Sequence, residues 1–80
     1  MKVTVRLFAG MREAVGESSV EFDDLPDGAR VSELREALEA RFPGLSGMAS
    51  MAAIDGEYVE EDAAIRDGRE VAFIPPVSGG

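Results

Sequence analysis

Apolar and polar residues alternate at the start of the chain, over residues 2–7. An alternation with a period of two is typical of a β-strand with one buried face, which here carries Val3, Val5 and Leu7. The next residue, Phe8, breaks this pattern because it adds a large ring to the opposite, wetter face. The opening pattern therefore predicts a strand followed by an exposed aromatic side chain.

Two further segments continue the prediction. Residues 10–16 lie between glycines and predict one or two helical turns, and residues 18–22 predict a second strand with Val20 and Phe22 on one face. After residue 30 the hydrophobic period changes to that of an amphipathic helix. The apolar stripe of this helix consists of Val31, Leu34, Leu38 and Phe42. Pro43-Gly44 is expected to end the helix, and residues 45–50 are expected to form a loop.

The C-terminal half is predicted to form short strands. The apolar residues 51–54 precede Asp55-Gly56, a dipeptide typical of a two-residue β-hairpin turn. The last predicted strand, residues 70–74, is stopped by Pro75-Pro76, because proline cannot donate a hydrogen bond to a sheet. The order of elements favours the α+β class, and we predict a β-grasp, ubiquitin-like fold. In this fold a mixed sheet of about five strands is covered by one main helix, and the first and last strands pair at its centre.

Composition excludes several kinds of chemistry. The 80 residues contain neither cysteine nor histidine, which removes disulfides, thiolate metal sites and the usual general base. The formal net charge is −8 and Lys2 is the single lysine, so we expect no binding to nucleic acid. We find no membrane-spanning segment and no signal peptide in the sequence, and we expect a cytoplasmic protein. These features suit a domain that is not an enzyme on its own.

Acidic residues cluster at two predicted turns. Asp23, Asp24 and Asp27 surround the first turn, and the residues that follow the hairpin turn are Glu57, Glu60, Glu61 and Asp62. A calcium loop would need oxygen ligands at fixed spacing, and Leu25 occupies one of those positions. We therefore expect solvated turns, no metal site and no bound cofactor.

The C-terminal segment indicates a candidate chemistry. We expect one domain over residues 1–75, followed by a flexible tail over residues 76–80 that Pro75-Pro76 projects from the body. Gly79 and Gly80 carry no side chain, so the tail could enter a narrow channel of a partner. A partner that uses ATP could adenylate the Gly80 carboxylate, and the resulting mixed anhydride could be attacked by a sulfur or nitrogen nucleophile.

A second candidate feature is an apolar patch. Phe8, together with either Phe73 or Ile74, is expected on the sheet face away from the helix. Two interpretations remain open for it. It is either a minor second core beneath loops or a docking surface for a partner protein.

Both ends of the chain resemble a known family. Residues 3–16, with Leu-Phe-Ala followed by Arg-Glu-Ala-Val-Gly, are similar to the N-terminus of MoaD-type sulfur carriers of the MoaD/ThiS ubiquitin-like family. Residues 67–80, which end in Ile-Pro-Pro-Val-Ser-Gly-Gly, resemble the C-terminus of that family almost residue for residue. Residues 31–44 resemble the family helix more loosely.

The resemblance implies the small subunit of molybdopterin synthase. In that family an E1-like (MoeB-like) adenylyltransferase activates the terminal glycine, here Gly80, which becomes a thiocarboxylate and donates sulfur to precursor Z. The resemblance further implies a heterotetramer with a MoaE-like large subunit. The implied partner-binding residues are Phe8, Ile74, Pro75, Pro76, Val77, Ser78 and Gly79. The same ending occurs in small archaeal modifier proteins, so conjugation to lysines of target proteins or a role in tRNA thiolation is the alternative.

Overall fold

The computed structural model describes residues 1–76, and their elements follow the predicted order. In chain order these elements are β1 (Val3–Leu7), α1 (Ala9–Val15), β2 (Ser19–Phe22), α2 (Val31–Arg41), the 3-10 helix η1 (Pro43–Leu45), β3 (Met51–Ile54), β4 (Glu57–Val59) and β5 (Glu70–Ile74). Val77, Ser78, Gly79 and Gly80 lie outside the described residues, so the predicted tail is described only at Pro76.

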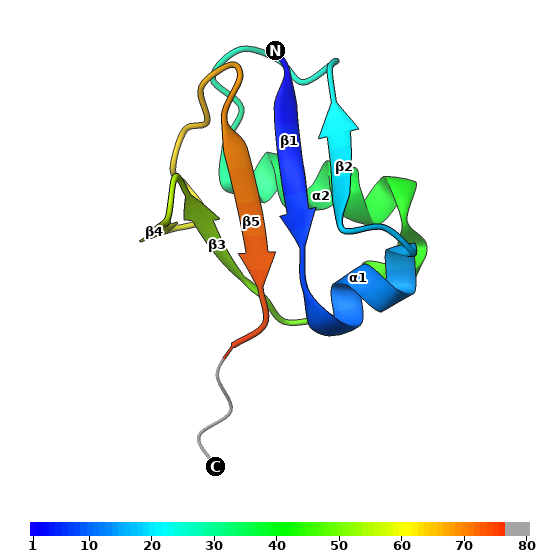
Figure 1. The fold of residues 1–80 in the computed structure, drawn as a ribbon. Helices are drawn as coiled ribbons and strands as arrows, with labels where there is room; N and C mark the ends of the chain where they lie inside the picture. Colours follow the sequence, from blue (N-terminus) through cyan, green and yellow to red (C-terminus); the bar gives the residue numbers. More distant parts are fainter. Residues whose placement is uncertain (77–80) are drawn as a thin grey trace.

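The strands form one five-stranded sheet in the order β2-β1-β5-β3-β4. The central strands β1 and β5 are parallel, whereas the other neighbouring strands run antiparallel. Figure 1 shows β1 and β5 side by side, with α2 crossing behind them. The predicted β-grasp arrangement, including the pairing of the first and last strands, is confirmed.

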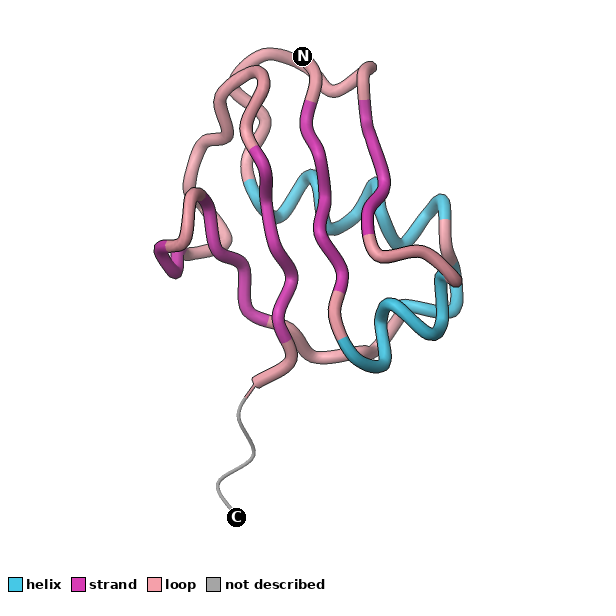
Figure 2. The backbone as a smooth tube through the Cα atoms, viewed as in Figure 1, coloured by secondary structure: helices cyan, strands magenta, loops and turns pink. Residues whose placement is uncertain are grey.

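The core lies between the sheet and α2. Val3, Val5 and Leu7 of β1 are buried, as the alternation predicted, and they face the buried side of α2. Leu34 and Leu38 supply that side of the helix, whose path behind the sheet is visible in Figure 2. Burying a side chain of this size contributes about 1.5–3 kcal/mol, so burial is what holds a helix with few internal charge pairs.

The expectation of a loop over residues 45–50 is wrong at its first residue. Leu45 belongs to η1 and is 1% exposed. Pro43 begins this 3-10 helix because its fixed backbone angle suits a first helical position. Ile65, in a segment without strand structure, is also buried at 2% exposure. Neither residue is part of a periodic pattern, so hydrophobic periodicity could not place them in the core.

The irregular segment between β4 and β5 is attached to the beginning of α2. The backbone N–H of Val31 donates to the carbonyl of Ala63 at 3.0 Å, and that of Ser32 donates to Glu61 at 2.9 Å. These carbonyls satisfy donors that the first turn of a helix leaves unpaired. The segment that contains Glu61 is therefore fixed relative to α2 by its backbone.

The β3–β4 hairpin turns at the predicted dipeptide. Asp55 and Gly56 have φ angles of 52° and 84°, the two positive values of a type I′ turn. Aspartate and glycine tolerate this backbone conformation, so the prediction of a hairpin at this position is confirmed.

Candidate functional site

The candidate site begins where β5 leaves the sheet. Phe73 is fully buried on the side of α2, whereas Ile74 is half-buried on the opposite face. Of the two residues that the sequence left open for the helix-free face, the structure therefore selects Ile74. Pro75 is half-buried and Pro76 is exposed directly after it.

Phe8 lies at the same end of the sheet. Its backbone is extended, with φ −132° and ψ 156°, so the alternation of β1 continues and turns the ring away from the core side of Leu7. Leu7 is the register partner of Phe73, and the two strands are parallel. Phe8 directly follows Leu7, and Ile74 directly follows Phe73, so Phe8 and Ile74 lie at corresponding positions on the helix-free face. Phe8 is 37% exposed.

Two more exposed apolar residues extend this surface, and both were missed by the sequence analysis. Met51 pairs with Ile74 across β3 and β5 and is 45% exposed. Tyr58 is 61% exposed. It pairs with Ala53 of β3, which also pairs with Ala72 of β5. Met51 and Tyr58 lie in short strands whose faces are hard to assign from sequence. We call Phe8, Met51, Tyr58, Ala72 and Ile74 the helix-free apolar patch.

Charged side chains occupy the neighbouring half of the same face. Arg6 and Glu70 form an ion pair with an N–O distance of 3.7 Å, and their side chains are 47% and 53% exposed. An exposed pair of this kind contributes little to stability, about 0–1 kcal/mol. The helix-free face thus combines an apolar area near the end of β5 with a polar area towards its start.

Two kinds of feature are absent from the described part of the chain, residues 1–76. Over residues 1–76, no group of three or more acidic, histidine or cysteine side chains is placed to hold a metal ion. Within the same residues, no helix has the length and apolar character needed to cross a membrane. The candidate chemistry that the sequence predicts lies in the C-terminal residues, of which the last four are not described.

The fold and the site define a ubiquitin-like β-grasp domain with an exposed apolar patch beside the strand that leads into Pro75-Pro76 and the terminal Gly-Gly. The ThiS family model matches residues 5–80, which includes both glycines. The chain belongs to the ThiS family.

Individual relatives are similar along their full length. The molybdopterin synthase sulfur carrier subunit of Chlamydomonas reinhardtii is 38% identical, with 100% of each chain covered. Small archaeal modifier protein 3 of Haloferax volcanii is 31% identical, also with 100% of each chain covered. Among solved structures, a putative molybdopterin converting factor subunit 1 of Pyrococcus furiosus superposes with a TM-score of 0.88 at 32% identity. That comparison covers 96% of this chain and 99% of the other.

Proposed function

We propose that the protein is the sulfur carrier subunit of a molybdopterin synthase and works in the cytoplasm. The observation that carries the proposal is the similarity to a sulfur carrier subunit over the full length of both chains. The match to the ThiS family model likewise extends to Gly80. The exposed apolar patch beside the end of β5 supports it, since a carrier must present both its reactive end and a surface that a partner recognises.

The proposed reaction uses the carboxylate of Gly80. In an E1-like, MoeB-like adenylyltransferase, this carboxylate attacks the α-phosphate of ATP and releases pyrophosphate. A sulfide-level sulfur nucleophile then displaces AMP from the acyl adenylate, which forms the C–S bond of the thiocarboxylate with no change of oxidation state. The protein binds no cofactor of its own in this scheme. ATP is bound by the activating partner, and sulfur passes to precursor Z in the active site of the large subunit.

The helix-free apolar patch is the proposed docking surface for a MoaE-like large subunit in a heterotetramer. Phe8 and Ile74 lie at the end of the sheet from which Pro75 and Pro76 emerge. Docking there would direct Val77, Ser78 and Gly79 towards the partner and place Gly80 in its active site. Apolar and aromatic side chains at the centre of an interface commonly supply most of its binding free energy.

The proposal is tested by deletion of Gly80, with the full chain and its partners present. We expect the deletion to abolish dithiolene formation and leave the free energy of unfolding unchanged, because Phe73 is the last residue of the buried core of the described chain. The intact mass of the wild-type protein from its host should include a form in which sulfur replaces one terminal oxygen. Undiminished cofactor synthesis in the deletion variant would refute the proposal.

A second candidate function is protein modification. It is favoured by the similarity to small archaeal modifier protein 3 over the whole chain. In this case a lysine ε-amine of a target protein would attack the activated carbonyl of Gly80, release AMP and form an isopeptide bond. The activated end could also supply sulfur for tRNA thiolation. Heavier conjugates that contain this chain, detected by blot and lost on deletion of Gly80, would support modification.

A further inference from the structure

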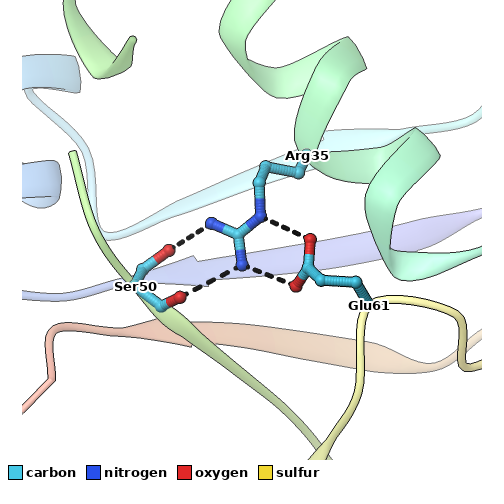
Figure 3. A network of polar contacts seen from close by, with 3 residues as sticks. All are labelled: Arg35, Ser50 and Glu61. Atoms are coloured by element: carbon cyan, nitrogen blue, oxygen red, sulfur yellow. Dashed lines mark hydrogen bonds and ion pairs between the residues drawn. The ribbon is translucent and has the colours of Figure 1, made fainter. Parts of the chain in front are cut away.

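Arg35 joins three separate parts of the molecule. From α2, its guanidinium donates to both carboxylate oxygens of Glu61, at 2.8 and 2.9 Å. It also donates to the hydroxyl and, at 3.2 Å, to the carbonyl oxygen of Ser50. Figure 3 shows these contacts converging on one guanidinium group. The same group lies 4.7 Å from the ring centroid of Phe73.

Two of these contacts are made at the place where β5 ends. Ser50 immediately precedes β3, and the first residue of β3, Met51, pairs with Ile74, the last residue of β5. The register of β5 with its other neighbour, β1, ends one residue earlier, at Leu7 and Phe73. Ile74 is therefore held in the sheet from one side, by the start of β3.

The partner of Arg35 is itself fixed. The Glu61 carbonyl accepts the N–H of Ser32 in the first turn of α2, so the Glu61 backbone is held independently of its side chain. Hydrogen bonding to Arg35 lowers the pKa of Glu61, which keeps the carboxylate ionised. Glu61 lies in an exposed turn, as predicted from the sequence, and its half-exposed side chain is in addition ion-paired with Arg35. A planar guanidinium with two bidentate partners has little freedom to shift.

We propose that Arg35 is a positioning residue for the C-terminal segment. Arg35 fixes Ser50 and covers Phe73, and it thereby determines the point at which the chain leaves the sheet. That point sets the placement of Met51 and Ile74 in the helix-free apolar patch. It also sets the direction in which Gly80 is delivered. The consequence for delivery rests on the proposed function, whereas the structural role of Arg35 does not.

Arg35→Lys is the informative variant, because lysine keeps the charge and loses the planar fork. Arg41→Lys is the matched control. Arg41 also lies on α2. Its Cζ atom is 5.1 and 5.4 Å from the ring centroids of Phe22 and Phe42, and its guanidinium donates to the Glu21 carbonyl at 2.9 Å. Its contacts lie at β2 and at the end of α2, away from the end of β5.

The first measurement is amide hydrogen exchange in the full chain, read by NMR. In Arg35→Lys we expect exchange at Met51 and Ile74 to accelerate at least about tenfold, with less than about threefold change at Val5, because local opening is separable from global unfolding. Arg41→Lys should leave the ratio between these sites unchanged. Equal acceleration at all three sites, or none at Ile74, would overturn the proposal. Glu61→Gln should give the same pattern with a smaller change.

The second measurement separates positioning from stability in sulfur transfer to the large subunit. Arg35→Lys should raise the KM for the carrier several-fold and change kcat less than about twofold, because a loosely placed segment costs more to order on docking. Equal KM values for Arg35→Lys and Arg41→Lys would refute the positioning role. A wild-type protein that transfers no sulfur would instead refute the proposed function, and the exchange experiment would still decide the role of Arg35.

Discussion

The two faces of the sheet use apolar residues in different ways. On the face covered by α2, apolar side chains are almost completely removed from water, as for Val5, Val71 and Phe73. On the helix-free face, Met51 and Tyr58 keep 45% and 61% of their surface exposed. The first arrangement stabilises the fold, whereas the second leaves apolar area available for a partner.

The difference is clearest within β5, where two adjacent residues have the two different roles. Phe73 and Ile74 are neighbours in sequence, yet the pleat of the strand sends their side chains to opposite faces. A small domain buries only a modest fraction of its surface, so it needs most of its apolar residues in the core. Apolar residues that stay exposed beside the end of β5 therefore indicate a function other than stability. The predictions below test this division.

The largest effect is expected from Phe73→Ala. Removal of a fully buried aromatic side chain leaves a cavity, so the free energy of unfolding should fall by about 3–5 kcal/mol. Ile74→Ala, at the next position, should cost about 1 kcal/mol or less because Ile74 is half-buried. Urea unfolding of both variants measures the difference. Similar losses for the two variants would show that the two faces are not energetically distinct.

The second prediction concerns partner binding. Ile74→Asp should weaken binding to the proposed large subunit by at least about tenfold, because it places a charge in the proposed apolar contact. Ser19→Ala, an exposed position of β2 opposite Arg6 in the register, is the control and should bind normally. Titration calorimetry measures both affinities. Unchanged binding of Ile74→Asp would move the docking surface elsewhere.

The third prediction concerns pH. The pKa of Glu61 is lowered below its ordinary value of 4.5, chiefly by its hydrogen bond to Arg35, so the ionised form stabilises the folded state. This contribution is present above pH 4.5 and is lost as the pH falls through the lower, folded-state pKa. Because the side chain is half-exposed, Glu61→Gln should cost less than about 1 kcal/mol at neutral pH.

Unfolding of wild type and Glu61→Gln across this pH range measures the effect. The difference between the two proteins should shrink on acidification. A difference that stays constant from neutral to acidic pH would show that the ionisation of Glu61 does not contribute to stability.

A small effect of the opposite sign is expected at the junction between β1 and α1. Ala9 has a φ of 49°, a left-handed conformation that disfavours a residue with a Cβ atom. Ala9→Gly should therefore raise the free energy of unfolding by up to about 1 kcal/mol. Asp55, with a φ of 52°, offers a comparison, since aspartate tolerates this conformation and Asp55→Gly should change less. Thermal unfolding shows whether the order of the two variants holds.

Prediction from sequence succeeded where a pattern repeats over several residues. The alternation in β1, the helical stripe of α2 and the Asp55-Gly56 turn each depend on neighbours in sequence, so local rules locate them. Leu45 and Ile65 were missed because single apolar residues in irregular segments have no period to identify them. The Glu61–Arg35 pair was missed because the two residues are distant in sequence and meet only after folding.

The sequence alone therefore determined the order of elements and the fold class, since these depend on local periodicity and on residue types. It also indicated the candidate chemistry at Gly79 and Gly80, which stays a prediction. Only the tertiary structure decided which of Phe73 and Ile74 faces outwards, that Met51 and Tyr58 join Phe8 on one surface, and that Arg35 holds the end of the sheet. Strand register and contacts between distant segments create these features, and neither is encoded in any short stretch of the chain.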